Sequence, residues 1–160
     1  KENPEMTIVG LKFFNVYGVR EFYKNTTSSM VIQLGHQILS GKTPRLFDGS
    51  DKILRDFINI EDVIQANIKA CNPKQNGVYN VGTGKPRSFQ DIADILQKEL
   101  NTNLGTEYFP NPYDGYQMHT QADISESEKY LQYKPKITLE QGIKDYVAEI
   151  RRLFEEEVKS

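Results

Sequence analysis

The sequence contains little cysteine or histidine and no long apolar run. Cys71 is the single cysteine, so an internal disulfide is excluded and a reducing compartment is expected. His36 and His119 are far apart, and no Cys/His/Asp cluster has metal-ligand spacing, so we expect no metal site. No apolar stretch is long enough to cross a bilayer, and no signal-peptide pattern is present. We therefore expect a cytoplasmic protein without a membrane partner.

Neither sign of charge dominates the chain. It has 20 Lys and Arg against 22 Asp and Glu, a net charge of −2 over 160 residues. Because the two signs are well mixed, we find no electrostatic footprint for nucleic acid and expect no nucleic-acid partner. The phosphates of a small ligand would have to be bound by individually placed Arg or Lys side chains.

The glycine fingerprint of a dinucleotide-binding loop is also missing, because neither G-x-G-x-x-G nor G-x-x-G-x-x-G occurs. Only Thr7–Phe14 and Gly77–Val81 read as strands buried on both faces, and strands of that kind need neighbours and cover. The chain also opens at Lys1 without methionine and enters the first of these runs almost at once. We therefore expect residues 1–160 to be the carboxyl-terminal portion of a longer α/β polypeptide.

Helical periodicity accounts for much of the remaining chain. The expected helices are Thr26–Ser40, Asn59–Cys71, Ser88–Leu100, a short one from about Ser125, and a last one from about Thr138. Ser88 with Asp91, and Thr138 with Gln141, predict capping boxes at two of these starts.

Short strands and turns are expected between the helices. Apolar runs on both sides of the turn Asp48–Asp51 predict short strands about a tight turn between Pro44 and Ile60. Glu107–Phe109 is expected to be a brief strand before the loop Pro110–Gln121.

Polar side chains follow the first expected strand. After Phe14 the sequence continues with Asn15, Gly18, Arg20 and Lys24. In open α/β sheets, ligands bind outside the carboxyl ends of the strands, where such side chains can contact them. On pattern alone, a ligand site and a solvated loop are equally good interpretations.

Four motifs carry a family resemblance: Phe13–Gly18 (FFNVYG), Phe47–Ser50 (FDGS), Arg55–Phe57 (RDF) and Asn80–Gly84 (NVGTG). Together they resemble the carboxyl-terminal half of an extended short-chain dehydrogenase/reductase that works on nucleotide sugars. Arg20-Glu21 followed by Lys24, and Tyr116-Gln117 followed by Thr120–Asp123, resemble more narrowly the ADP-L-glycero-D-manno-heptose 6-epimerase family. The resemblance runs from about Ile8 to the last helix. It departs at Val19, where the family usually has proline.

The resemblance implies a Rossmann-like fold of which this chain supplies mostly the substrate-binding lobe, with one or two strands of the sheet. The dinucleotide-binding domain would lie outside this chain, in an amino-terminal part. The implied reaction is epimerisation at carbon 6 of ADP-glycero-manno-heptose by transient oxidation and re-reduction with NADP, for the lipopolysaccharide inner core. A homo-oligomer, a pentamer in this family, is implied as well. The fragment alone is expected to be inactive.

The resemblance also implies roles for individual residues. Lys24 would be the catalytic acid–base group, and Lys24 and the Val16 backbone would lie near the nicotinamide. Phe47 would stack the base and Arg55 would grip the diphosphate. The implied substrate-binding residues are Asn15, Thr26, Gln33, Phe47, Asp48, Gly49, Ser50, Arg55 and Tyr116, with Gln33 standing where a histidine is expected.

Two further stretches of the sequence resemble catalytic motifs without matching them in context. Gly82–Lys85 is not a Walker A loop, because Tyr79 stands at the first glycine position and Pro86 follows the lysine. We interpret it as a tight strand-to-helix connection. Tyr130 and Lys134 match the reductase Tyr-x-x-x-Lys spacing by accident, and the catalytic pair should lie upstream.

Two alternative functions stay open. One is a related nucleotide-sugar 4-epimerase or 4,6-dehydratase, which would not need Lys24. The other is a non-catalytic binding fragment, which would be favoured if the full-length protein lacked both the dinucleotide glycines and the Tyr-x-x-x-Lys pair.

Overall fold

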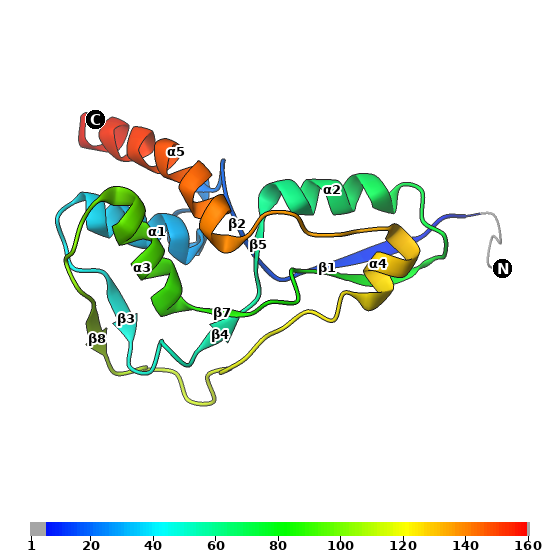
Figure 1. Cartoon of the computed structure of the whole chain (residues 1–160), viewed down its shortest axis with the longest axis horizontal. Helices are drawn as coiled ribbons and strands as arrows, with labels where there is room; N and C mark the ends of the chain where they lie inside the picture. The colour runs from blue at the N-terminus through cyan, green and yellow to red at the C-terminus, as the bar shows by residue number, and fades with distance from the viewer. Residues whose placement is uncertain (1–5, 160) are drawn as a thin grey trace.

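The computed structural model describes residues 6–159 and arranges them in two groups of elements (Figure 1). The first group is built on the parallel strands β1 (Val9–Phe13) and β6 (Gly77–Val81), with two helices against them, α2 (Ile60–Ala70) and α4 (Ser125–Leu131). The second group contains the three packed helices α1 (Met30–Leu39), α3 (Phe89–Leu100) and α5 (Leu139–Lys159). Strands β2 (Asn15–Tyr17) and β5 (Phe57–Asn59) pair in parallel and lie between the two groups.

The strands β1 and β6 are more open than the apolar sequence predicts. Val9 lies opposite Gly77 and Phe13 opposite Val81, so both expected strands form, and they pair with each other in parallel. However, the side chains of Ile8, Phe13 and Val78 are 61%, 49% and 64% exposed. Burial on both faces is therefore not found within residues 6–159, because α2 and α4 cover only part of this pair.

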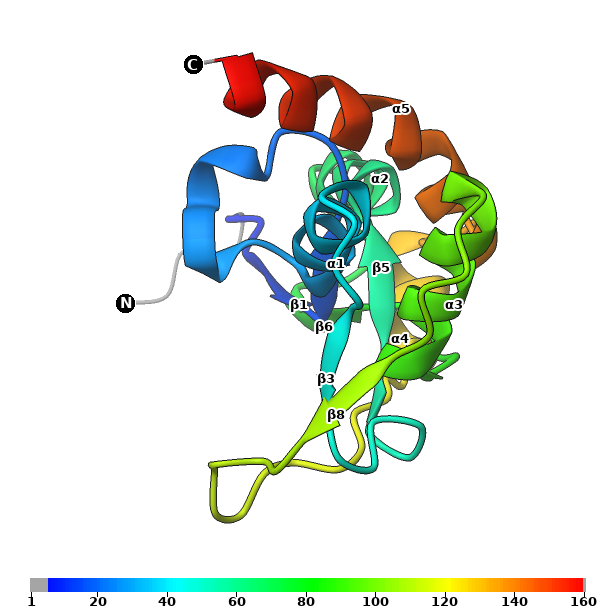
Figure 2. The same ribbon diagram turned by 90° about the vertical axis from the view of Figure 1, so that its left-hand side faces the viewer.

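The strands expected on the two sides of a tight turn form, but they do not pair with each other. The turn itself is present: the amide of Ser50 donates to Phe47 O at 3.0 Å, and Gly49 has φ +77°. Strand β3 (Arg45–Phe47) pairs instead in parallel with β8 (Glu107–Phe109), and β4 (Leu54–Arg55) pairs antiparallel with β7 (Arg87–Ser88). Figure 2 shows β3 and β8 side by side.

The helix expected from Thr26 is split into two pieces. Phe22–Thr27 form a short 3-10 helix, η1, which contains the non-helical residue Asn25 (φ 50°, ψ −124°), and α1 begins only at Met30. Ser29 occupies the N-cap position of α1, but its hydroxyl donates to Glu21 and does not cap the helix. The expected helix therefore loses its first turn to a loop that Glu21 organises.

The predicted caps are largely confirmed. The Ser88 hydroxyl accepts from the Asp91 amide at 3.0 Å and Asp91 accepts from the Ser88 amide at 2.8 Å, so the capping box of α3 is complete. Asn59 caps α2 by accepting from the Glu61 amide at 2.9 Å. At α5 only half of the predicted box forms: Thr138 accepts from the Gln141 amide, while the Gln141 side chain donates to Asp145.

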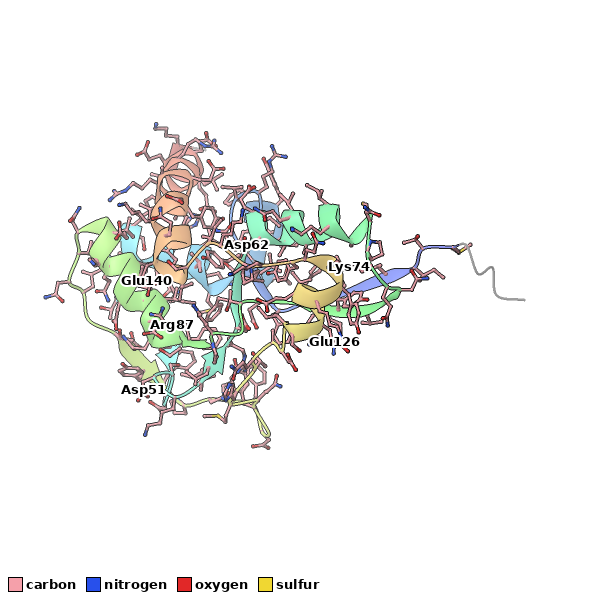
Figure 3. All side chains as sticks on the ribbon, turned by 45° about the vertical axis from the view of Figure 1, so that its right-hand side comes forward. Asp51, Asp62, Lys74, Arg87, Glu126 and Glu140 are labelled. Atoms are coloured by element: carbon pink, nitrogen blue, oxygen red, sulfur yellow. The ribbon has the colours of Figure 1, made fainter. Side chains whose placement is uncertain are left out.

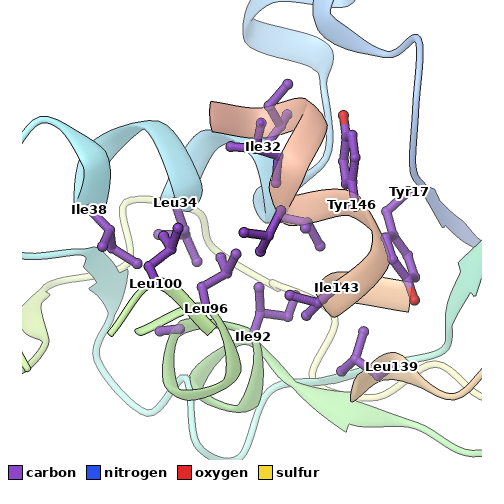
Figure 4. Packing of buried hydrophobic residues seen from close by; sticks show 14 of the residues in the cluster. Tyr17, Ile32, Leu34, Ile38, Ile92, Leu96, Leu100, Leu139, Ile143 and Tyr146 are labelled. Atoms are coloured by element: carbon purple, nitrogen blue, oxygen red, sulfur yellow. The ribbon is translucent and has the colours of Figure 1, made fainter. Parts of the chain in front are cut away.

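The main core lies where α1, α3 and α5 meet (Figure 4). Its fully buried side chains include Leu34, Ile92, Leu96 and Ile143. Helix α5 also approaches β2 closely at Gly142, where an added Cβ would overlap the Tyr17 hydroxyl. This contact fixes α5 against the strand from which the candidate site begins.

Candidate functional site

A cleft of about 430 Å³ opens where the chain leaves β2. Its walls are Val16 and the following loop on one side and the first turns of α2 on the other, and Arg20 and Lys24 are among its lining residues. Gly18 makes this arrangement possible, because it has φ +138° and an added Cβ would come within 2.6 Å of the Ile60 side chain. The cleft therefore lies at the carboxyl end of a parallel strand, where ligands of α/β folds bind.

Lys24 presents an unpaired ammonium at this cleft. Its side chain is exposed on η1 and makes no hydrogen bond or ion pair with any residue from 6 to 159. Its backbone, by contrast, is tied down: the Lys24 amide donates to Glu21 O at 2.9 Å, and the Thr27 hydroxyl donates to Lys24 O at 2.7 Å. A cation on a fixed backbone can act on a bound molecule.

The loop that carries Lys24 is strained. Arg20 has φ +71° and Asn25 has φ +50°, a region that non-glycine residues seldom adopt. Such conformations cost on the order of 1–3 kcal/mol each and tend to gather at functional sites. Both lie within five residues of Lys24 in the sequence, which supports the assignment of this loop to a site.

A second cavity of about 320 Å³ lies between α1 and the β3–β8 pair. Phe47 forms its aromatic wall, with ring centroids 5.0 Å from Phe109 and 5.7 Å from Tyr116, both edge-to-face. Gln33 and Ser50 also line it. The aromatic rings are therefore already packed together and offer a preformed surface for a planar group.

Arg55 holds its guanidinium against this aromatic wall. It is 7% exposed, and it donates to Leu54 O at 2.9 Å and Gln117 O at 2.5 Å. The guanidinium carbon lies 5.2 Å from the ring centre of Tyr116. None of the ion pairs in the described part of the chain involves Arg55. A buried cation without a carboxylate is costly, and an anionic ligand would compensate it.

Of the other expected substrate-binding residues, three line these cavities and three do not. Gln33 donates to Ser28 O at 2.7 Å and lines both the second cavity and an adjoining one of about 330 Å³, which Thr26 also lines. The Ser50 hydroxyl donates to Phe47 O at 2.6 Å. The remaining three, Asn15, Asp48 and Gly49, are exposed and lie outside these linings.

Buried carboxylates are the feature that the sequence analysis missed. Asp56 is fully buried, and its two oxygens accept from the amides of Thr83, Gly84 and Ala122 at 2.7, 2.8 and 3.0 Å. The Thr83 hydroxyl adds a fourth hydrogen bond at 2.6 Å. The amides of the Gly82–Lys85 loop thus bind an internal carboxylate, which agrees with the rejection of this loop as a phosphate site.

A second carboxylate, Asp62, plays a similar part by binding a segment that is distant in the sequence. It is fully buried on α2 and accepts from the amides of Lys136 and Ile137 at 3.0 Å, which fastens the segment before α5 (Figure 3). Only the position of Asp56 inside the Arg-Asp-Phe motif hinted at such a role, and no signal marked Asp62.

Metal and membrane signals are weak throughout residues 6–159. No group of three or more His, Cys, Asp or Glu side chains among them is arranged to hold a metal ion. No helix in the same range is both long and apolar enough to cross a membrane.

The chain is similar to known proteins in both sequence and structure. The family model described as "NAD dependent epimerase/dehydratase family" matches residues 1–82. The chain is similar to the ADP-L-glycero-D-manno-heptose-6-epimerase of Brachyspira hyodysenteriae, with 40% identity over 151 residues, 91% of this chain and 47% of that protein.

Solved structures give the same picture. The ADP-L-glycero-D-manno-heptose-6-epimerase of Helicobacter pylori superposes with a TM-score of 0.85 and 45% identity, over 92% of this chain and 46% of that one. A mutant UDP-glucuronic acid 4-epimerase of Bacillus cereus, solved in complex with UDP-4-deoxy-4-fluoro-glucuronic acid and NAD, superposes with a TM-score of 0.79 and 30% identity, over 94% of this chain and 47% of that one. The chain spans about half the length of these relatives.

Proposed function

The chain belongs to the NAD dependent epimerase/dehydratase family, and from this premise we propose that it is the carboxyl-terminal part of an enzyme that inverts carbon 6 of ADP-glycero-manno-heptose. The observation that carries the proposal is the ammonium of Lys24 in the cleft beyond β2, which no residue from 6 to 159 pairs with. The identities of 40% and 45% to two heptose 6-epimerases support this substrate over other nucleotide sugars. The product would be a heptose precursor of the lipopolysaccharide inner core.

The proposed domain organisation follows from the open strands. Phe13 on β1, Val78 on β6 and Ile8 just before β1 are each at least 49% exposed, and parallel strands are normally covered on both faces. We place these strands at one end of a larger Rossmann-like sheet, whose other strands and dinucleotide-binding loop belong to an amino-terminal domain. Residues 1–160 would then supply mostly the substrate-binding lobe.

The cleft around Lys24 suits one end of a nicotinamide dinucleotide. Val16, Ile60 and Ile64 give it apolar walls, and Gly18 leaves room for close approach to the backbone. When bound, NADP would accept a hydride from carbon 6 and return it. The sequence has no glycine fingerprint for the pyrophosphate, so the rest of the cofactor would be held outside this chain.

Lys24 would handle the proton that accompanies each hydride. When carbon 6 loses a hydride to become a ketone, its hydroxyl must lose a proton, and the reverse step must supply one. Neutral Lys24 can accept that proton and its ammonium can donate one. Inversion requires hydride return to the opposite face of the ketone, and a single acid–base group cannot easily serve both faces. The tyrosine of an upstream Tyr-x-x-x-Lys pair would serve the other face.

The second cavity would hold the ADP portion while the sugar ketone turns its opposite face to the cofactor. Phe47 offers an aromatic surface for the base, and Arg55, which lies over the ring of Tyr116 beside this cavity, offers a buried positive charge for the diphosphate. Asn15, Thr26, Gln33, Asp48, Gly49 and Ser50 complete the proposed substrate-binding set.

Lys24→Met in the full-length protein tests the proposal. Methionine keeps most of the apolar stem, so the fold and the affinity for ADP-sugar should persist while epimerisation falls by roughly 10²–10⁴-fold. Lys42→Met, at an exposed lysine just after α1, is the matched control and should retain parental rates.

Half-reactions sharpen the test. With an aldehyde analogue at carbon 6, hydride transfer can be measured separately on each face of the carbonyl. Lys24→Met should slow the transfer mainly on one face. Parental rates on both faces would remove Lys24 from the chemistry. Activity on UDP-sugars in place of ADP-heptose would instead favour a 4-epimerase, the class of the Bacillus cereus relative.

A further inference from the structure

Glu21 joins the two ends of the loop that carries Lys24. One carboxylate oxygen accepts from the Gly18 amide at 3.2 Å and from the Ser29 hydroxyl at 2.8 Å, and the other accepts from the Ser29 amide at 2.7 Å. Gly18 precedes η1 and Ser29 follows it, so one side chain closes the whole segment between them. In Figure 2 this is the blue segment that projects beside α1.

The setting of Glu21 differs from that of a surface carboxylate. It is 5% exposed, and no Lys, Arg or His forms an ion pair with it in the described part of the chain. Its charge is stabilised by donors from the loop itself. Tyr146 of α5 faces it as well: burial first, and then the negative charge of Glu21, raise the pKa of the Tyr146 hydroxyl.

Lys24 depends on this closure for its position. Its ammonium has no hydrogen-bond or ion-pair partner among residues 6–159, so the backbone sets the point from which the side chain reaches into the cleft. That backbone is bonded directly to Glu21, whose carbonyl accepts from the Lys24 amide at 2.9 Å. The strained Arg20 and Asn25 lie inside the closed segment, and strained residues persist only when their surroundings hold them.

We infer that Glu21 is a positioning residue, which sets the place of the Lys24 ammonium in the cleft through the closed loop 18–29. The inference rests on the proposed role of Lys24 in proton transfer. Glu21 does not contact the reacting atoms; it acts through Lys24. Displacing a catalytic group by about 1 Å can cost on the order of 10²-fold in rate, so the effect of opening the loop should be measurable.

The experiment is a double-mutant cycle in the full-length protein with Glu21→Gln and Lys24→Met. The glutamine amide would place an NH₂ group against loop donors and break at least one hydrogen bond. We expect Glu21→Gln to lower kcat by about 10- to 100-fold, with KM for the ADP-sugar changed less than about threefold. In the Lys24→Met background it should lower kcat no further, because non-additivity marks residues that act together. Hydrogen exchange in residues 18–29 should become faster.

Asp62→Asn is the matched control. Asp62 is also a buried carboxylate that accepts from backbone amides, but its donors belong to Lys136 and Ile137. Asp62→Asn should leave hydrogen exchange in residues 18–29 unchanged. Any decrease in kcat that it causes should be independent of the decrease caused by Lys24→Met, so that the two effects multiply in the double mutant. Should Glu21→Gln fail to fold, Ser29→Ala removes only the hydroxyl donor and should shift kcat and exchange in the same direction by less.

Two results would contradict the inference alone: parental exchange in residues 18–29 of Glu21→Gln, or additive losses in the cycle, while Lys24→Met is slow. Parental rates in Lys24→Met itself would overturn the proposed function, and the inference with it. The hydrogen-exchange measurement needs neither cofactor nor substrate, so it separates the two failures.

Discussion

Arg55 brings a positive charge into an almost buried position. Two backbone carbonyls and two aromatic rings, Tyr116 and Phe89, surround its guanidinium. Carbonyl dipoles stabilise a cation less than a full negative charge does, and the planar guanidinium has five donors, of which the carbonyls use only a part. The geometry therefore leaves donors and charge for a phosphate.

Arg55→Ala in the full-length enzyme should weaken binding of the ADP-sugar by about 2–3 kcal/mol, the range for charge-assisted hydrogen bonds. Arg55→Lys should recover only part of this loss, because lysine lacks the planar guanidinium that can donate two parallel hydrogen bonds to a phosphate. Titration calorimetry with the ADP-sugar measures both. Lys52→Ala, at an exposed lysine in the turn after β3, is the control and should bind as the parent does. Unchanged affinity in Arg55→Ala would exclude Arg55 from the site.

Residue by residue, the sequence points to candidate chemical groups more readily than to the groups that support them. Lys24, Phe47 and Arg55 stand in short motifs, so a family resemblance is enough to make them candidates. The role of Asp56 was not predictable in this way, because its donors Thr83 and Ala122 lie 27 and 66 positions away. Only the folded chain brings those amides to the carboxylate, and the same holds for Asp62.

At the scale of elements, α1, η1 and α5 meet at His36. Its ring lies 5.7 Å from that of Phe154 on α5 and 6.1 Å from that of Phe22 on η1. Its Nδ1 is 3.4 Å from a Glu157 carboxylate oxygen, and its Nε2 is buried without a hydrogen-bond partner in the described structure. Burial lowers the pKa of His36, and Glu157 opposes that shift only in part.

This junction should weaken in mild acid. Because the folded-state pKa of His36 lies below its ordinary value of 6.5, the unfolded chain binds the proton more readily. The stability that neutral His36 confers is present above about pH 6.5 and is lost as the pH falls through the folded-state pKa. Urea unfolding of the full-length protein between pH 5 and 8 should show this loss in the parent and a smaller one in His36→Leu. His119→Leu, in an exposed loop, should follow the parent; identical profiles for all three proteins would contradict the prediction.

Elements whose signals are local were predictable, and elements that depend on distant pairing were not. The capping box of Ser88 and Asp91 lies within four residues and was confirmed. The strands around Asp48–Asp51 also form, but their partners, β8 and β7, are far away in the sequence. Local apolar and turn signals identify a strand without identifying the strand beside it. Strand β4 also has a distant neighbour in the loop before α4: the Leu54 amide donates to Met118 O, and the Thr120 amide donates to Leu54 O.

At the scale of the whole molecule, the two groups of elements differ in how complete they are. The group of α1, α3 and α5 surrounds a core in which Leu34, Ile92 and Ile150 have no exposed surface. The β1–β6 pair instead leaves large apolar side chains open, and on the neighbouring helix α2 Ile64 and Ile68 are 44% and 66% exposed. Apolar surface of this kind is usually covered by another part of the protein.

The proposed placement of the dinucleotide-binding domain outside this chain leads to a prediction about residues 1–160 on their own. They should not bind NADP tightly, because the pyrophosphate needs a glycine-rich loop at a helix start that this sequence lacks. The open faces of β1, β6 and α2 should bind an apolar dye such as ANS, and full-length protein should bind much less dye per chain. Cofactor fluorescence titration and dye binding on both proteins, compared side by side, give the measurement. Tight, saturable NADP binding by residues 1–160 would show that the cofactor site is complete within this chain, and equal dye binding would show that nothing else covers its open strands.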